Sequence, residues 1–298
     1  MRAIVRGCRG SLATPGSHTL RRGGNTSCVE IRLPHETLLI LDAGTGIREL
    51  GVELAGSPGR RPIHLVLTHL HLDHLEGLGF FVPLWQPETE LHIWGPPSKR
   101  ESLRSRIARF LAPPFFPVLL ADAPSHITFH DVPHEPWTIG TATITAQPVL
   151  HPGPTVGYRV EAEGGVLVYL PDHEPYLGGQ RPDIGTDWIS GFDLARDADV
   201  LMHDAQFTEA EYPAKVGWGH SSVAQAVEFA KVTGVERLLL FHHDPLHDEE
   251  QLDAIEARAY ELWDGYGQPP TLAVEGSEHM LGTAALAKGP ETERFSAQ

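Results

Sequence analysis

A short segment with three histidines and one aspartate constrains this chain more than any other feature. The apolar run at residues 63–67 is followed by residues 68–74, which contain the pattern His-x-His-x-Asp-His. On an extended segment His69 and His71 point the same way, because side chains alternate with a period of two. Two neutral imidazoles directed at one point suit a borderline cation such as zinc. The chain must then turn for the remaining aspartate and histidine to face a second point, so the pattern predicts a site for two metal ions.

Further residues that commonly bind metals each end or follow an apolar, strand-like run. They are His151 after residues 143–150, Asp172 at the end of 165–171, and His242 after 235–241. Each lies where a strand is expected to give way to a loop, and this is the position at which α/β sheets usually carry ligands. We therefore expect these residues to join the histidines of the first segment.

Taken in order, these residues resemble the metal ligands of the metallo-β-lactamase superfamily, and the resemblance extends over about residues 7–276. It implies two divalent metal ions with one set of ligands: His69, His71 and His151 for the first, Asp73, His74 and His242 for the second, and Asp172 bridging both. A histidine-rich set favours zinc, although mixed nitrogen and oxygen ligands also accept manganese or iron. The resemblance implies a four-layer αββα sandwich, whereas periodicity alone predicts only a mixed α/β protein.

Several residues next to the expected ligands require a choice. His242 and His243 are adjacent, and only one of them can point inward, so we take His242 as the ligand and His243 as a supporting partner. We also expect His173 to support the ligands rather than to bind a metal. Asp42 has two compatible roles: it could cap the helix that follows, or it could orient a metal-binding histidine, as the equivalent aspartate does in the family it resembles.

The resemblance also implies a type of reaction. A water shared by two divalent cations is acidified enough to supply hydroxide near neutral pH, which implies a metal-dependent hydrolase with a metal-bridging hydroxide as nucleophile. Residues 203–207 and 219–222 resemble the paired motifs of the tRNase Z and small cyclic-phosphate phosphodiesterase branch. On that resemblance Asp204 orients His220, and His220 protonates the departing oxygen, which is typically worth ~10²–10⁴-fold in rate. Asp73 is counted with them as catalytic. The alternative makes Asp204 a loop residue and His220 a helix cap.

The leading hypothesis is a phosphodiesterase for a small phosphodiester such as a cyclic nucleotide. Transfer-RNA processing is not favoured, because the interval between His151 and Asp172 is too short for the protruding arm that many of those enzymes carry. A lactone or thioester hydrolase is the alternative enzyme, since it can use much the same ligands. An alternative of another class is a metal-binding sensor or interaction module without significant turnover.

Charge and composition indicate which classes of partner the protein can bind. The 298 residues carry a net charge of −16, with 39 acidic against 23 basic side chains, which argues against sequence-independent binding to nucleic acid. One basic stretch stands out, and its helical spacing predicts a solvated helix face: Lys99, Arg100, Arg104, Arg106 and Arg109. Two cysteines, with neither a signal peptide nor a membrane span, predict a cytoplasmic protein. A homodimer is left open.

We expect one hydrolase domain over residues 1–284, followed by a C-terminal tail at 285–298. An insertion at about 96–124 departs from a minimal sandwich, and we expect it to form a lid whose Phe115 or Phe116 lines the substrate cleft; packing on the core is the alternative. Strands are predicted at residues 3–5, 28–33, 37–41, 63–67, 91–94, 127–129, 142–149, 156–161, 166–170, 200–202, 237–241 and 271–274. Helices are predicted at residues 45–55, 98–110, 221–233 and 248–263.

Overall fold

The fold is built on two β-sheets. The computed structural model describes residues 1–34, 37–56, 62–178 and 185–282, so the predicted tail at 285–298 lies outside the described residues. The first sheet has the order β14-β1-β2-β3-β4-β5-β6 and the second β13-β12-β11-β10-β9-β8-β7. The strands of the first sheet, in chain order, are β1 (Arg2–Gly7), β2 (Cys28–Arg32), β3 (Leu38–Leu41), β4 (Ile63–Val66), β5 (Glu90–Gly95), β6 (His126–Asp131) and β14 (Glu278–Met280). Those of the second are β7 (Trp137–Ile139), β8 (Ala142–Pro148), β9 (Val156–Ala162), β10 (Gly165–Leu170), β11 (Val200–Asp204), β12 (Arg237–Phe241) and β13 (Thr271–Leu272).

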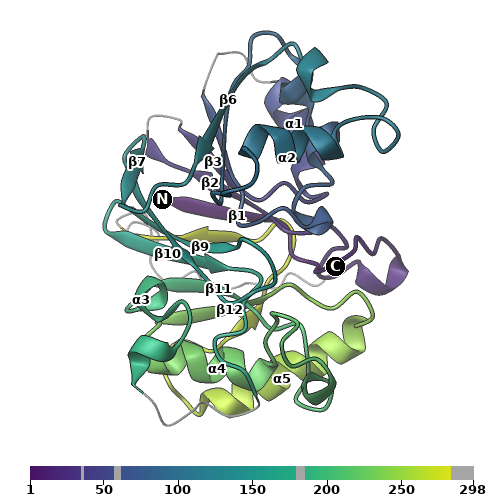
Figure 1. The fold of residues 1–298 in the computed structure, drawn as a ribbon. Coiled ribbons are helices and arrows are strands. Elements are labelled where there is room, and N and C mark those ends of the chain that lie inside the picture. Colours follow the sequence, from purple (N-terminus) through teal and green to yellow (C-terminus); the bar gives the residue numbers. More distant parts are fainter. Residues whose placement is uncertain (35–36, 57–61, 179–184, 283–298) are drawn as a thin grey trace.

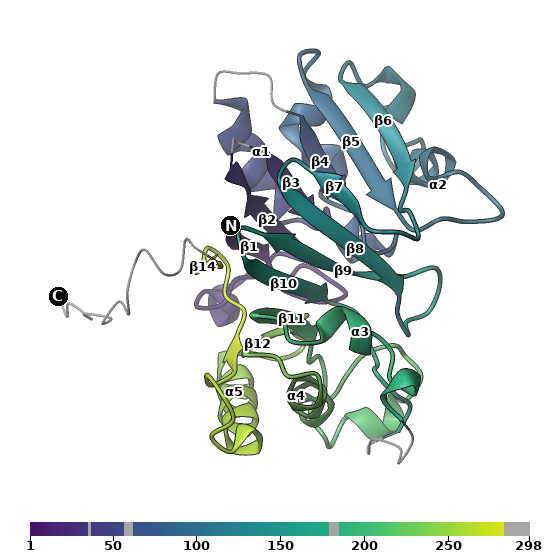
Figure 2. The same ribbon diagram turned by 90° about the vertical axis from the view of Figure 1, so that its left-hand side faces the viewer.

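Helices cover the outer face of each sheet (Figures 1 and 2). The first sheet is covered by α1 (Ile47–Ala55) and α2 (Leu103–Phe110). The second is covered by α3 (Phe192–Ala195), α4 (Val223–Val232) and α5 (Glu249–Trp263). In the orientation of Figure 1 the two groups of helices lie at opposite ends of the molecule, with both sheets between them. The predicted four-layer αββα sandwich is therefore confirmed.

Three hydrophobic cores hold these layers together. The central core lies between the sheets, where Ile31 and Leu39 of the first sheet share one buried cluster with Tyr158 and Val160 of the second. The outer cores join each sheet to its helices. Because β10 has core on both faces, its sequence Gly-Val-Leu-Val-Tyr-Leu is apolar throughout, as is usual for a strand that is covered on both sides.

The chain topology brings several strand ends to one edge of the sandwich. Strands β3 to β6 are parallel to one another, and so are β10 to β13. The carboxyl ends of parallel strands meet at a common edge, so the loops after them lie close together. Two bonds join the sheets at this edge: Tyr158 donates its hydroxyl proton to the Leu67 carbonyl at 2.7 Å, and the Val156 amide donates to the Thr68 carbonyl at 3.0 Å.

The helix boundaries follow local capping. Helix α4 begins after Ser222, whose side chain forms a capping box with Gln225. Helix α2 begins at Leu103 rather than at the predicted residue 98, because the Ser102 side chain accepts the Ser105 amide and fixes the start there. The short elements β7, β14 and α3 were not predicted, since segments of three or four residues show too little periodicity. Within the described ranges, no helix has both the length and the apolar character needed to cross a bilayer.

Candidate metal centre

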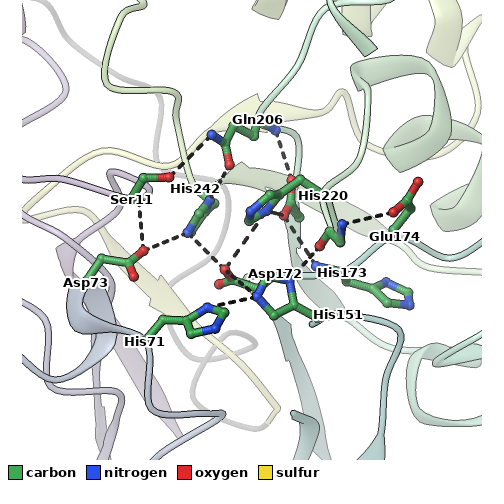
Figure 3. Close-up of polar contacts among 12 residues, drawn as sticks. Ser11, His71, Asp73, His151, Asp172, His173, Glu174, Gln206, His220 and His242 are labelled. Atoms are coloured by element: carbon green, nitrogen blue, oxygen red, sulfur yellow. Dashed lines mark hydrogen bonds and ion pairs between the residues drawn. The ribbon is translucent and has the colours of Figure 1, made fainter. Parts of the chain in front are cut away.

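The seven predicted metal ligands converge at this edge between the sheets. Figure 3 shows His71, Asp73, His151, Asp172 and His242 of this cluster. They come from loops that follow β4, β8, β10 and β12, which explains how residues so distant in sequence meet. The side chains form two adjoining groups in which the candidate ligand atoms lie within 4.8 Å of one another: His69, His71 and His151 in the first, and Asp73, His74, Asp172 and His242 in the second. We refer to these as the first group and the second group.

In the first group three ring nitrogens face one another. His151 Nε2 lies 3.1 Å from His71 Nδ1, and both His69 Nε2 and His151 Nε2 lie 3.8 Å from Asp172 Oδ1. Three nitrogens around one point, with a carboxylate oxygen at the border, form a donor set that suits a tetrahedral divalent cation.

The second group is richer in oxygen. His74 Nε2 lies 2.9 Å from Asp172 Oδ2 and 3.3 Å from Asp73 Oδ2. His242 Nε2 lies 3.2 Å from Asp73 Oδ2 and 3.2 Å from Asp172 Oδ1. Asp172 therefore lies between the two groups: Oδ2 faces His74, whereas Oδ1 lies 3.2 Å from His242 and 3.8 Å from both His69 and His151.

The outward ring nitrogens of these histidines are tied to acceptors. His74 Nδ1 donates to Asp42 at 2.8 Å, His151 Nδ1 to the Gly219 carbonyl at 2.8 Å, and His242 Nδ1 to the Gln206 side-chain carbonyl at 3.1 Å. With the outward N–H held in this way, the inward Nε2 of each ring is the atom that can direct a lone pair at the centre of the cluster once it carries no proton. This is the usual arrangement of metal-binding histidines.

Unpartnered atoms test whether a cation fits. Among the described residues, His69 Nε2, His74 Nε2 and Asp172 Oδ2 are buried without a hydrogen bond. His74 Nε2 and Asp172 Oδ2 lie 2.9 Å apart, so these two unpartnered atoms meet at the same place in the cluster. Buried polar atoms are rarely left unsatisfied, and the donor set therefore fits divalent metal ions.

The two groups differ in proton affinity. Burial lowers the pKa of His69 and His71 and lowers the pKa of His151 to about 4. Burial acts in the same direction on the second group, but there the carboxylates outweigh it. They raise the pKa of His74 and raise the pKa of His242 to about 9. These histidines in turn lower the pKa values of the neighbouring aspartates despite burial. The second group therefore binds protons in competition with a cation.

The predictions for neighbouring residues have different outcomes. His242 faces the second group, whereas the ring of His243 lies with Nε2 2.9 Å from the Ala273 carbonyl and touches no candidate ligand side chain. The His173 ring points away as well, toward His203 at 2.8 Å. The rings of His173 and His243 each bind a partner elsewhere in the core, because consecutive side chains diverge, and His173 instead contributes its main-chain amide to the Asp204 carboxylate.

Asp42 supports a histidine rather than a helix. Helix α1 begins after Gly46 and has no side-chain cap. The Asp42 carboxylate instead accepts the His74 ring N–H, the Thr68 amide at 2.7 Å and the Thr68 hydroxyl. Asp42 and His242 both have a φ of 60°. Such left-handed conformations cost a non-glycine residue about 1–3 kcal/mol and are commonly found at functional sites.

Asp204 and His220 lie beside the second group. His220 Nδ1 is 2.6 Å from Asp204 Oδ2 and 3.9 Å from Asp172 Oδ1, and the ring stacks on His242 with centroids 4.9 Å apart. The amides of Gln206, Ser221 and His173 donate to the Asp204 carboxylate and fix its position. Ser222 caps α4, so His220 is not the helix cap.

Other contacts were not anticipated from the sequence. The Ser11 amide donates to Asp73 at 2.8 Å, and Gln206 is the acceptor for His242. The buried Glu174 carboxylate accepts the Tyr212 hydroxyl at 2.6 Å and the Gly219 amide at 2.9 Å, and the Gly219 carbonyl in turn binds His151. A Cβ at Gly219 would lie 2.5 Å from the His151 ring. These residues lack a recognisable spacing, although Glu174 follows Asp172 closely and Gly219 precedes His220.

A cleft of about 600 Å³ opens beside the first group. It is lined by His69, Leu70, His71, Pro97, Ser98, Lys99, Arg100, Glu101, Arg106, Arg109, Pro152, Gly153 and Pro154. Neither Phe115 nor Phe116 is among these lining residues, and Phe116 follows the alternative of packing on the core. Phe115 is 81% exposed, and Phe116 packs on Phe80 and Trp85, because the outer core draws this aromatic ring away from the cleft.

The basic side chains are mostly exposed, as the predicted solvated face requires, but most of them also line the cleft. Four of the five cations in that stretch line the cleft, and Arg104 is the exception. The cause is the late start of α2, which leaves residues 97–101 as a loop that turns toward the histidines.

Similarity to known proteins assigns the chain with this geometry to a family. The family described as beta-lactamase superfamily domain matches residues 37–243, which is more than half of the chain. The chain belongs to this superfamily. The metallo-β-lactamase fold protein YhfI from Bacillus subtilis is similar in structure, with a TM-score of 0.67 and 20% identity over 94% of this chain and 99% of that one. Zn²⁺-bound PqqB from Methylobacterium extorquens gives a TM-score of 0.67 at 18% identity over 94% and 100% of the two chains.

Among curated proteins, ribonuclease BN of Cronobacter sakazakii is 24% identical over 267 residues, covering 76% of this chain and 85% of the relative. The superfamily, the fold and the cluster together make this chain a metal-dependent hydrolase that binds divalent metal. The expectation that nucleic acid is an improbable partner is not supported, because a relative is itself named as a ribonuclease. Net charge describes the whole surface and does not by itself determine what one cleft accepts.

Proposed function

We propose that this superfamily member is a dinuclear metal-dependent phosphodiesterase that acts on a small phosphodiester such as a cyclic nucleotide. The observation that carries the proposal is the pair formed by His220 and Asp204, which lies against Asp172 of the metal cluster. Hydrolysis of a sugar phosphodiester expels an alkoxide, which is a poor leaving group and benefits from a nearby proton donor.

The proposed ligands are the first group for one cation and Asp73, His74 and His242 for the other, with Asp172 shared. Zinc is the proposed metal because nitrogen donors predominate, and manganese or iron is compatible with the same atoms. When bound, two such cations would acidify a shared water and neutralise charge that develops on the phosphoryl group.

His220 is proposed to hold and deliver the proton. Because its Nδ1 N–H is directed to Asp204, the opposite nitrogen, Nε2, is the atom available to donate to the departing oxygen. The Asp204 carboxylate stabilises the protonated ring, and the backbone amides that bind Asp204 prevent it from moving away. Asp204 therefore acts through His220 as a positioning residue.

A small substrate is favoured by the architecture around the cluster. The chain between His151 and Asp172 contains only strands β9 and β10 and their short connections, without an extended arm. A cleft of about 600 Å³ is within the usual range of ~300–1,000 Å³ for small-molecule sites.

The test compares leaving groups in the His220→Ala variant. We expect turnover of a cyclic nucleotide to fall by about 10²–10⁴-fold. Hydrolysis of a bis-nitrophenyl phosphodiester should change little, because nitrophenolate departs without a proton. His126→Ala is the matched control, since His126 is exposed on β6. Equal losses on both substrates would reject the acid role, and a wild-type protein that cleaves lactones or thioesters but no phosphodiester would favour the alternative enzyme.

A further inference from the structure

We propose that Lys99 and Arg100 bind a second phosphate of the substrate, so that the preferred substrate is a small phosphodiester that also carries a phosphate monoester. This inference rests on the proposed function, because it assumes that the diester itself lies at the metal ligands. It assigns a specificity role to residues that are not part of the metal cluster.

The position of the cleft is the first argument. Its walls include His69 and His71 of the first group, the loop at residues 152–154, and the loop at 97–101 with the side chains of Arg106 and Arg109. A molecule whose diester contacts the first group therefore extends between the two loops. The volume of about 600 Å³ accommodates a substrate of nucleotide size.

The charge of the cleft is the second argument. The chain carries a net charge of −16, yet this cleft contains four cationic side chains and one carboxylate. That carboxylate, Glu101, forms an ion pair with Arg109. Across the described ranges, neither Lys99 nor Arg100 makes an ion pair, and both are exposed to solvent. A cationic cleft on an acidic protein attracts anions locally and directs them to the cluster.

The support beneath the loop is the third argument. Arg106 is half-buried and donates from Nη2 to the Pro96 carbonyl at 2.6 Å, which ties the start of the loop to helix α2. The Ser102 cap fixes the other end of the loop. Two consecutive prolines, at positions 96 and 97, restrict the backbone between strand β5 and the loop. A loop that is held before the ligand arrives loses less entropy on binding, which favours recognition.

The number of cations favours a small molecule over RNA. An RNA strand presents phosphates along an extended path, and proteins that bind it rely on many basic groups along that path. Here two adjacent cations of the cleft, Lys99 and Arg100, lie in one loop beside the cluster, at a position that suits a single additional phosphate.

The experiment compares two substrates that differ only in the second phosphate: a 2′,3′-cyclic nucleotide with a free 5′-hydroxyl and the same nucleotide with a 5′-phosphate. For the wild-type metal-loaded protein we expect kcat/KM to be about tenfold higher with the 5′-phosphate, since two partly exposed cations contribute modestly. In Lys99→Ala/Arg100→Ala this preference should disappear through an increase in KM at unchanged kcat. Arg104→Ala, on the same basic stretch but outside the cleft, should retain it.

A binding measurement separates the inference from the proposed function. Titration calorimetry with adenosine 3′,5′-bisphosphate and with adenosine reports the phosphate contacts whether or not any diester is hydrolysed. We expect the wild-type protein to bind the bisphosphate about tenfold more tightly than the double variant does, with a difference that shrinks at high salt. If bare diesters are hydrolysed but neither assay shows a phosphate preference, the inference fails and the proposed function stands. Tighter binding of an RNA oligonucleotide than of the bisphosphate, with loss in the same double variant, would overturn the small-molecule assignment.

Discussion

The two groups of the metal centre are neighbours, but their charges are balanced in different ways. In the first group three imidazoles face one another, and Asp172 lies 3.8 Å from His69 and from His151. In the second group His74 and His242 are surrounded by carboxylates at 2.8–3.3 Å. The first group is accordingly neutral near pH 7, whereas the second holds protons on its histidines unless a cation takes their place.

This difference implies separate requirements for the two cations. A metal ion that enters the first group meets ring nitrogens that already carry no proton. Its affinity therefore depends little on pH near neutrality. A metal ion that enters the second group must displace protons, although it gains more from the negative charge there. The predictions below test whether the two groups are distinct in this way.

The largest effect is expected from Asp172→Asn, because Asp172 is the side chain that both groups share. The amide cannot serve two cations with two anionic oxygens, so we expect diester hydrolysis to fall by roughly 10³-fold. We also expect metal content, measured by elemental analysis, to fall below two equivalents. Asp193→Asn is the control, since Asp193 is an exposed residue that pairs with Arg196. Two tightly bound metal ions in Asp172→Asn would contradict the shared role.

The pH dependence of metal binding should differ between the two equivalents. The pKa of His242 is raised to about 9 without metal, so the affinity of the second group should fall as pH decreases from 9 toward 6.5, by up to about tenfold per unit for each proton displaced. The first group should remain unaffected over this range, because the pKa of His151 is lowered to about 4. Calorimetry in buffers of different ionisation enthalpy measures the protons released by each equivalent.

The same pKa shift affects the stability of the metal-free protein with a defined sign. A pKa raised on folding stabilises the native state at pH values below the unfolded value of about 6.5, and the contribution is lost as pH rises through the folded value of about 9. We therefore expect the free energy of unfolding of metal-free protein to decrease across this interval. Equal proton release by both equivalents would show that the groups are not electrostatically distinct.

A smaller and selective effect is expected from substitutions next to each group. Asp42→Asn removes a carboxylate that accepts the His74 N–H, so metal affinity of the second group should fall by about 10–100-fold while the first group is retained. Glu174→Gln places an amide opposite the N–H of Gly219, the residue whose carbonyl orients His151. This substitution should lower the metal affinity of the first group by about tenfold. Competition with a chromophoric chelator resolves the two affinities.

The double variant supplies the control for this pair. If the two groups are independent, the losses in Asp42→Asn and Glu174→Gln should appear on different equivalents and add in the combined protein. Loss of the same equivalent in both single variants would contradict the separation of the groups, as would a general decrease in melting temperature without any selective change in affinity.

In the cleft, the structure differs from what the sequence predicts. Phe115 and Phe116 follow prolines, and the sequence predicts that one of them lines the substrate cleft or packs on the core. In the structure Phe116 packs against Phe80 and Trp85, and no local sequence pattern identifies these neighbours. The basic stretch was assigned to a helix from residue 98, and a regular helix would expose these side chains. Because Ser102 caps the helix, α2 starts at Leu103, and residues 98–102 form a loop beside the cluster instead of the expected start of the helix.

The sequence by itself determined the chemistry of the centre and its order along the chain, because each candidate ligand follows an apolar strand and strand ends are local features. It also determined the superfamily, since the spacing of the first histidine segment is specific. Only the tertiary structure decided which of two adjacent histidines faces inward, which buried partners orient the rings, and which side of the insertion meets the cleft. These outcomes depend on contacts between residues far apart in the chain, such as Glu174 with Gly219 and Asp42 with His74. Short-range periodicity in the sequence cannot predict such contacts.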